Sequence, residues 1–287
     1  FGVFPSSEFF VSAFQISKKY NIPFIVHMHD LWEENIDQNQ KSKKIFAIKW
    51  EKIIFKEAHT IFCMNNVQAD HYEKKYRIKT KILPHTIKSE FLKKNISFNI
   101  KKQKNKIRKI LYTGNISHLM NLDAMQQFIK AINYLPDHYE IKIFCSFDID
   151  TCKKLNLYND RIKYDWLPIN EVKAEMADAD LLFLPLSHKN GAMDEVRTVF
   201  ATKTLDYLIS GTPILVFSPK NSFHSMSAKS GNWGYVVDTD EPKEIANGIG
   251  KVINNKDLSN QLVENAFKEA LSRDSKIFSK KLFDSLP

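Results

Sequence analysis

The stretch that decides the fold is Val196–Phe217, which reads VRTVFATKTLDYLISGTPILVF. Its first residues indicate a polar loop that carries Arg197 and Thr198. A helix is then predicted from about Thr202, the expected N-cap, to Ser210, because leucine and isoleucine recur there at helical spacing.

The second half of this stretch indicates a buried strand. Gly211 and Pro213 end the helix, and the short apolar run 214–217 is typical of a parallel strand inside a sheet. A helix N-terminus at a crevice binds anions through free backbone N–H groups. Lys203 adds a positive charge in the first turn of this helix, and Asp206 follows one turn later on the same face.

The length and composition favour a protein with two α/β domains. The chain has 287 residues, of which 43% are hydrophobic and 12% aromatic, enough to bury a large core. Glycine and proline are too sparse for a disordered chain, and no internal repeat is evident. The first five residues, FGVFP, are typical of the end of a strand rather than of a signal peptide, so we expect an N-terminal truncation.

The cysteines and the lack of a long apolar run favour a cytoplasmic protein. Cys63, Cys145 and Cys152 have no metal or redox spacing and lie in or beside apolar stretches, as is typical of reduced thiols. No apolar run approaches the roughly 20 residues that a membrane span requires.

Positive charge is concentrated in the first part of the chain. Residues 1–109 contain 22 lysines and arginines against 10 acidic residues, a balance of +12, whereas the remainder has 20 against 23, a balance of −3. A basic N-terminal part indicates an anionic partner, either nucleic acid or the anionic face of a membrane. A solvated, lysine-rich surface explains the same counts equally well.

Strands and helices alternate along the chain, which implies parallel sheets with right-handed crossovers. Residues 88–109 are basic and have no apolar period, so we expect them to connect two domains. In the first domain, helices are predicted at residues 6–19, 43–58 and 67–76, and strands at 24–29, 60–64 and 80–83.

Polar residues that directly follow predicted strands are the site candidates, because they face the ligand crevice of an open parallel sheet. His29 ends the strand at 24–29 and Asp30 follows it, and these two are the candidate catalytic residues. His27 shares a strand face with His29, which raises the possibility of a metal site. Two histidines without a third ligand are more often packed or hydrogen-bonded groups, so no metal is expected.

The second domain offers two further strand ends. Gly114 and Asn115 form a turn between a strand and a helix, which alone is weak evidence for a phosphate loop. Trp166 and Leu167 follow another strand.

The order of these segments is similar to that of a known family. The C-terminal half resembles the nucleotide-sugar domain of retaining GT-B-type glycosyltransferases (glycosyl transferases group 1, or family 4-like). Residues 1–90 resemble the second half of that family's N-terminal domain, with Glu51 in a long helix. The matching segments of the C-terminal half are YTGN at 112–115, DWLP at 165–168, ADL at 179–181 and KTLDYLISGTP at 203–213.

The resemblance implies an α/β fold of GT-B type with two Rossmann-like, doubly wound parallel-sheet domains, the first incomplete. Residues 1–100 would form the rest of the acceptor-side domain with a basic linker, and residues 101–270 the donor domain. Residues 271–287 would form a C-terminal helix that packs back on the N-terminal domain.

The resemblance also implies roles for the candidate residues. Asp206 takes the donor ribose hydroxyls, a sound task for an ionised carboxylate. The turn at Ala201 and Thr202, together with Lys203, holds the diphosphate, and Arg197 helps to neutralise it.

The sequence departs from the family pattern at three positions. A second family carboxylate falls on Thr198, and basic residues of the family fall on Asn115 and Met120. Gly114 and Asn115 are still expected at the donor phosphates, and Trp166 and Leu167 at the base.

The implied function is transfer of a sugar from a nucleoside-diphosphate sugar to an acceptor hydroxyl, with retention and without a metal or other cofactor. The acceptor is expected to be a growing cell-surface polysaccharide or a lipid-linked sugar, with peripheral contact at the inner face of an anionic membrane and without nucleic acid as a partner. A sugar-nucleotide epimerase and a non-catalytic nucleotide- or polyanion-binding remnant are the alternatives.

Simpler interpretations apply to single residues. Lys203 and Asp206 could form an ordinary exposed i, i+3 pair. Trp166 could anchor a core or hinge, Gly114 could be only a turn glycine, and Arg197 a solvated loop residue.

Overall fold

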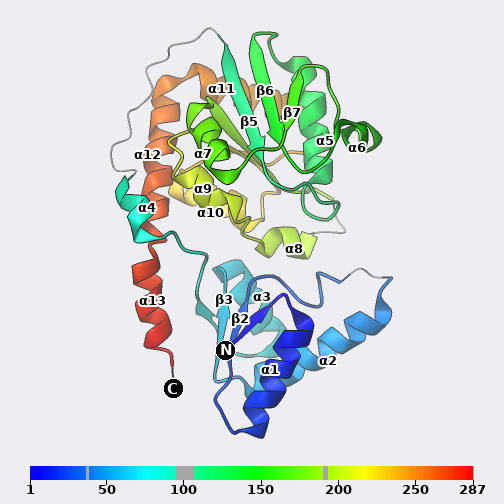
Figure 1. Cartoon of the computed structure of the whole chain (residues 1–287), viewed down its shortest axis with the longest axis vertical. Helices are drawn as coiled ribbons and strands as arrows, with labels where there is room; N and C mark the ends of the chain where they lie inside the picture. The colour runs from blue at the N-terminus through cyan, green and yellow to red at the C-terminus, as the bar shows by residue number, and fades with distance from the viewer. Residues whose placement is uncertain (37–38, 95–106, 190–192, 287) are drawn as a thin grey trace.

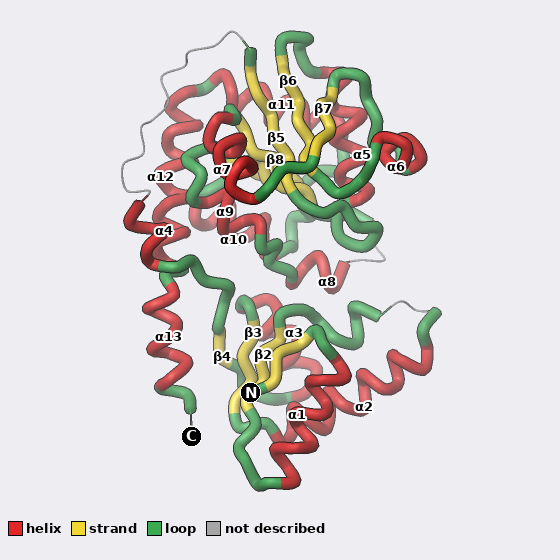
Figure 2. Tube along the Cα trace, in the orientation of Figure 1, coloured by secondary structure: helices red, strands yellow, loops and turns green. Residues whose placement is uncertain are grey.

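The computed structural model describes residues 1–36, 39–94, 107–189 and 193–286, and it contains two α/β domains, each with a wholly parallel sheet (Figure 1). Helices flank the strands of both sheets (Figure 2). The predicted domain boundary at residue 100 lies outside the described residues. No helix within the described ranges is long and apolar enough to cross a bilayer.

The first domain has a four-stranded sheet in the order β1-β2-β3-β4. The Asn65 side chain accepts a hydrogen bond from the Gln68 backbone N–H at the start of α3, which is the cap expected of an asparagine there. The elements of this domain are β1 (Gly2–Phe4), α1 (Ser7–Lys19), β2 (Ile25–Met28), α2 (Lys41–Glu57), β3 (Thr60–Cys63), α3 (Asn66–Tyr76) and β4 (Lys81–Ile82).

The second domain has a six-stranded sheet in the order β10-β9-β8-β5-β6-β7. The chain therefore starts in the middle of the sheet, adds strands on one side and then returns to add strands on the other. Its strands are β5 (Arg108–Thr113), β6 (Tyr139–Phe144), β7 (Ile162–Asp165), β8 (Leu181–Pro185), β9 (Ile214–Phe217) and β10 (Tyr235–Val237).

The helices of the second domain cover both faces of this sheet (Figure 2). Their apolar stripes pack on strands that are buried along their whole length, such as β8 and β9. The helices after β5 are α5 (Leu122–Ala131), η1 (Ile132–Tyr134), α6 (Ile149–Lys154), α7 (Ile169–Asp178), α8 (Met193–Thr198), α9 (Lys203–Leu208), α10 (Phe223–Gly231), α11 (Pro242–Asn254) and α12 (Lys256–Ser272).

The reversal of strand order places a crevice at the carboxyl ends of β5 and β8, which are neighbours in the sheet. Ligands bind at such switch points in open α/β sheets. Gly114 directly follows β5, and α9 begins beside this edge after the segment that follows α8.

The stretch 196–217 differs from the prediction in two respects. Arg197 and Thr198 lie in the helix α8 rather than in a loop, because Val196 is completely buried against Leu186 and its neighbours. Thr202 precedes α9 as expected, but its backbone is helical and its side chain makes no capping hydrogen bond. The predicted strand is confirmed as β9.

Two short segments connect the domains. The helices α4 (Ser89–Lys94) and α13 (Ser275–Phe283) meet where the Ile87 backbone N–H donates to the Arg273 carbonyl and the Ser275 N–H donates to the Ile87 carbonyl. Phe278 and Leu282 of α13 pack on a small cluster of the first sheet, formed by Ile25, Phe62 and Leu83.

A direct polar contact also joins the domains. The Asn65 side-chain amide donates a 2.6 Å hydrogen bond to the Thr198 carbonyl, so α3 of the first domain lies against α8 of the second. Asn65 is buried, and Figure 1 shows α8 at the lower face of the second domain, toward the first.

The first domain is held together by a buried carboxylate on α2. Glu51 is completely buried and accepts hydrogen bonds from the Lys75 ammonium at 3.1 Å, from the hydroxyls of Tyr72 and Tyr76, and from the Glu33 backbone N–H. These donors come from α3 and from the segment after β2. Glu51 therefore ties three parts of the domain together.

We expect Glu51→Ala to lower the free energy of unfolding by about 3 kcal/mol, because the Tyr76 hydroxyl and the Glu33 N–H lose their acceptor and Lys75 loses one of its three carboxylates. Urea denaturation followed by circular dichroism measures this change. Glu57→Ala, which breaks the exposed pair with Lys18, is the control and should cost no more than about 1 kcal/mol. Equal losses in the two variants would contradict the account.

Candidate active site

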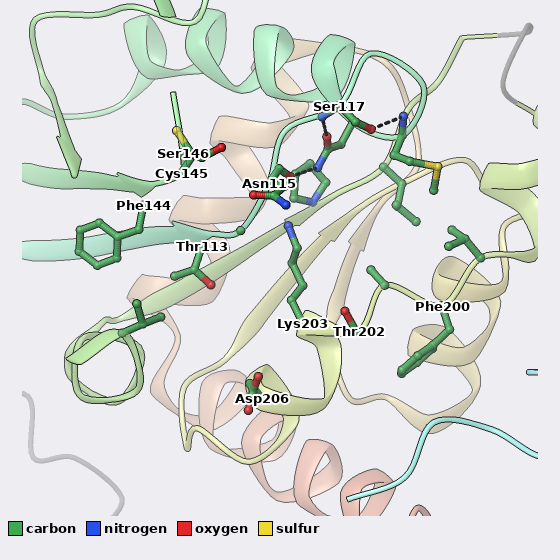
Figure 3. A pocket seen from close by; sticks show the side chains of 18 of the residues that line it. Thr113, Asn115, Ser117, Phe144, Cys145, Ser146, Phe200, Thr202, Lys203 and Asp206 are labelled. Carbon is green, nitrogen blue, oxygen red and sulfur yellow. Dashed lines mark hydrogen bonds between the residues drawn. The ribbon is translucent and has the colours of Figure 1, made fainter. Parts of the chain in front are cut away.

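A cavity of about 960 Å³ lies at the switch point and reaches from the second sheet to the first domain. This volume is at the upper end of the range of about 300–1,000 Å³ that is typical of ligand pockets. Figure 3 shows its wall at β5 and α9. Of the predicted site residues, those that line it are His29, Asp30, Gly114, Asn115, Trp166, Leu167, Ala201, Thr202, Lys203 and Asp206.

The Tyr112 hydroxyl organises the centre of the site. It donates to the Asn115 carbonyl at 2.7 Å and accepts from the Asn121 amide at 3.0 Å. Because Tyr112 is completely buried, these bonds fix the loop after β5. Gly114 in this loop has φ of 119°, a conformation that favours glycine.

Lys203 extends from α9 toward this loop (Figure 3). Its ammonium donates to the Tyr112 hydroxyl at 2.7 Å and lies 4.2 Å from the centre of the Tyr112 ring, a cation–π contact. Burial lowers the pKa of Lys203 to about 7. Lys203 is therefore a desolvated cation at the cavity wall, a state that a bound anion would stabilise.

Asp206 lies one turn further along α9, at the rim of the cavity (Figure 3). Its carboxylate is 3.6 Å from the Lys173 ammonium, and the side chain is 39% exposed, so it remains available to a ligand. Lys203 and Asp206 thus have different partners and do not form the ordinary i, i+3 pair. Trp166 is 68% exposed at the same end, whereas the neighbouring Leu167 packs on the core.

The structure does not support the expected place of Arg197 at the diphosphate. Its guanidinium lies 3.5 Å from Asp194 and 3.4 Å from His71 Nδ1, on the side of α8 that faces α3. Arg197 does not line the cavity, because α8 is a helix and turns this side chain toward the first domain.

The histidines after β2 form a hydrogen-bonded series. His27 Nε2 lies 2.9 Å from the Leu83 carbonyl, an acceptor, so this nitrogen carries the proton. Burial lowers the pKa of His27 to about 4, so the ring is neutral and its Nδ1 accepts from His29 Nε2 at 3.3 Å. Burial also lowers the pKa of His29, which favours a neutral ring whose Nδ1 can accept a proton.

Asp30 and His85 complete this end of the cavity. The rings of His29 and His85 lie 4.9 Å apart, and burial raises the pKa of the Asp30 carboxyl. Across the described ranges, no three histidine, cysteine or acidic side chains group closely enough to hold a metal ion.

Glu195 is a cavity residue that the sequence did not identify. It lies on α8, is 6% exposed and lines the cavity at the end where Asp30 lies. Thr198, the position where the family has a carboxylate, is turned away, since its hydroxyl donates to the Asp194 and Glu195 carbonyls of its own helix. The sequence signal that could have identified Glu195 was its position as an acidic residue one helical turn before Thr198.

Comparison with known proteins identifies a family whose profile matches the domain that contains most of this cavity. Residues 93–269 match the profile of the family described as glycosyl transferases group 1. The chain belongs to this family. The match spans more than half of the chain and contains the whole second sheet. No curated protein sequence matches the chain at a significant level.

Solved structures share the fold of this group 1 member at low sequence identity. Sucrose-phosphate synthase from Thermosynechococcus elongatus has a TM-score of 0.70 at 12% identity, over 95% of this chain and 69% of that one. HepE of Anabaena, solved in complex with UDP and glucose, has a TM-score of 0.69 at 15% identity, over 96% and 74%. These likenesses confirm the predicted GT-B fold with an incomplete N-terminal domain.

We expect Gly114→Ala to disturb the site, because the added Cβ would lie 2.8 Å from Lys203 Nζ and the backbone would be strained. The expected loss is about 1–3 kcal/mol in the free energy of unfolding, measured by urea denaturation. Gly250→Ala in α11 is the control, since its Cβ meets only Asn254 at 4.0 Å, and it should be neutral or stabilising. If Gly114→Ala left the free energy of unfolding unchanged, Lys203 would not approach Gly114 as closely as the structure indicates.

Proposed function

We propose that the protein transfers a sugar from a nucleoside-diphosphate sugar to an acceptor hydroxyl, with retention at the transferred carbon. The observation that carries the proposal is the buried ammonium of Lys203 at the wall of a large cavity. Nucleoside diphosphates are anions of suitable size for such a cavity. HepE of Anabaena, which shares the fold, was solved with UDP-glucose and with UDP.

In this proposal the nucleotide lies along the edge of the second sheet. The base contacts Trp166 and Leu167, and the Asp206 carboxylate accepts hydrogen bonds from the ribose hydroxyls.

The diphosphate lies between the Gly114–Asn115 loop and the turn of Ala201 and Thr202, with Lys203 beside it. Because α9 has only six residues, the charge of Lys203 contributes more than the helix end.

The chemistry is departure of a nucleoside diphosphate from the sugar. A cation held beside the leaving group stabilises the negative charge that develops there, and Lys203 supplies it without a metal or cofactor. His29 and Asp30 lie at the other end of the cavity, where the sugar and the acceptor would meet. Retention fits departure and attack on the same face of the sugar, which needs no protein nucleophile.

The first domain has a surface suited to an acceptor at a membrane. Ile45, Phe46 and Ile48 of α2 are 67%, 45% and 40% exposed. Lysines precede and follow them, at positions 41, 43, 44 and 49. An exposed apolar and basic helix favours peripheral contact with an anionic bilayer. We therefore propose a cytoplasmic enzyme of cell-surface polysaccharide or glycolipid synthesis, at the inner membrane face.

We expect UDP or GDP to bind the wild-type protein and Lys203→Met to weaken binding about 10- to 100-fold, the effect of losing a hydrogen bond to a charged group. Asp206→Ala should weaken it about 10-fold. Only protonated Lys203 attracts the diphosphate, so wild-type affinity should fall as pH rises above about 7, while the affinity of Lys203→Met should not. Isothermal titration calorimetry between pH 6.5 and 9 measures the affinity of the wild-type protein and of both variants.

Lys243→Met, at an exposed position of α11, is the matched control and should bind like wild type. The proposal fails if no nucleoside diphosphate binds, or if Lys203→Met binds unchanged. Incubation with a sugar nucleotide and no acceptor tests for an epimerase, which would convert it to a second sugar nucleotide. A protein that binds the sugar nucleotide but transfers no sugar when acceptors are added would be a non-catalytic remnant.

We expect the protein to sediment with vesicles of phosphatidylcholine and phosphatidylglycerol, and not with phosphatidylcholine alone. Phe46→Ser combined with Lys49→Gln should reduce the bound fraction severalfold. Lys251→Gln in α11, on the second domain, should not. Equal binding to both vesicle types would contradict the membrane contact.

A further inference from the structure

One oxygen of the Glu195 carboxyl is an unsatisfied polar atom in the cavity wall. The side chain is more than nine-tenths buried, and its Oε2 atom has no hydrogen-bond partner among the residues that the structure describes. Buried polar atoms in folded proteins are almost always hydrogen-bonded, and an unsatisfied one is costly. A ligand in the cavity would supply the partner that the protein does not.

The surroundings of Glu195 limit what that partner can be. Burial, together with the charges of Asp30 and Glu34, raises the pKa of Glu195 to about 8, so the carboxyl is mostly neutral near pH 7. A neutral carboxyl donates one hydrogen bond and accepts another. A hydroxyl group, which also donates and accepts, is complementary to it, whereas an anion is disfavoured by the carboxylates nearby.

The position of Glu195 along the chain points to the sugar of the donor. Val199, Phe200 and Ala201 line the cavity between Glu195 and Lys203, so one continuous segment runs from the carboxyl to the expected diphosphate site. The sugar of a nucleotide sugar is attached to the distal phosphate. It would therefore extend from Lys203 along this segment, with Asp30 of the first domain on the opposite side.

We propose that Glu195 and Asp30, one from each domain, bind hydroxyl groups of the transferred sugar, and that this sugar is a neutral hexose rather than a uronic or other acidic sugar. This inference rests on the proposed function, because the sugar reaches Glu195 only when a diphosphate lies at Lys203.

The groups near Glu195 determine the expected pH dependence. The charges that act on Glu195 are those of Asp30 and Glu34 after β2. The helices α3 and α10 pack against α8 and contain His71 and His224, and α8 itself contains Asp194 and Arg197, which pair with each other. Burial lowers the pKa of His224 to about 3, so this ring stays neutral in the relevant range. Above about pH 8 Glu195 loses the proton that it donates to the sugar, so one hydrogen bond is lost and the contribution of the hexose to binding should fall.

The test compares the affinity of a nucleoside diphosphate with that of its hexose conjugate, using UDP and UDP-glucose, or GDP and GDP-mannose if GDP is the one that binds. Calorimetry gives the ratio of the two affinities for each variant. We expect Glu195→Ala to reduce this ratio about 10-fold while the affinity for the diphosphate alone changes less than about twofold. Glu195→Gln, which keeps a donor and an acceptor, should stay within about threefold of wild type.

Two further readouts sharpen the test. For the wild-type protein, the affinity of the hexose conjugate relative to that of the diphosphate should decrease between pH 7 and 9. For Glu195→Gln this ratio should not decrease. UDP-glucuronate should bind to the wild-type protein more weakly than UDP-glucose. Glu264→Gln, at an exposed position of α12, is the charge-matched control. Thermal melting confirms that each variant is folded.

The outcomes are distinguishable. If the diphosphate binds to wild type but Glu195→Ala leaves the ratio unchanged, the inference is wrong and the proposed function stands. If UDP-glucuronate binds as tightly as UDP-glucose, the preference for a neutral sugar is wrong. If neither diphosphate nor conjugate binds to wild type, the proposed function itself fails.

Discussion

The site depends on one contact, the ammonium of Lys203 against the hydroxyl and ring of Tyr112. The same hydroxyl holds the loop after β5 through the Asn115 carbonyl and Asn121, so the loop and α9 are fixed relative to each other. The contact leaves the cation largely dehydrated and without a full counter-charge, which is why its pKa falls to about 7. A dianionic ligand would offset the free-energy cost of burying the Lys203 charge, so this wall of the cavity favours a diphosphate.

The cavity is electrically asymmetric, and its asymmetry follows from the placement of the two domains. The second domain contributes the cation at one end, while Asp30 of the first domain and Glu195 of α8 give the other end two carboxyls. The Asn65–Thr198 hydrogen bond holds α8 against α3 and so keeps these carboxyls on facing sides. A nucleotide sugar has the complementary arrangement, with an anionic diphosphate followed by a ring of neutral hydroxyls.

Local chemistry made much of the fold predictable. Alternating apolar runs and breaks indicated the parallel sheets and the helix α3, because strands and helices depend on neighbours in sequence. The errors arose from tertiary contacts. Arg197 and Thr198 were predicted to lie in a loop, but the helix α8 forms there because Val196 packs against Leu186. The burial of Glu51 on α2 also depends on tertiary contacts, since Lys75 and Tyr76 reach it from α3.

In the candidate site, too, the residues set by local sequence were predictable and those set by tertiary contacts were not. Strand-end residues such as Gly114 and Asn115 line one cavity, since parallel strands bring their carboxyl ends to one edge of the sheet. The orientation of Arg197 and the burial of Glu195 could not be derived in this way, because both depend on how α8 rests against α3.

The most direct test of the central claim is a crystal structure of the protein with its bound nucleoside diphosphate. We expect the diphosphate within hydrogen-bonding distance of Lys203 Nζ, with the ribose at Asp206 and the base beside Trp166. A nucleotide bound elsewhere, or a diphosphate that leaves the Lys203 ammonium on Tyr112 without contacting it, would contradict the account.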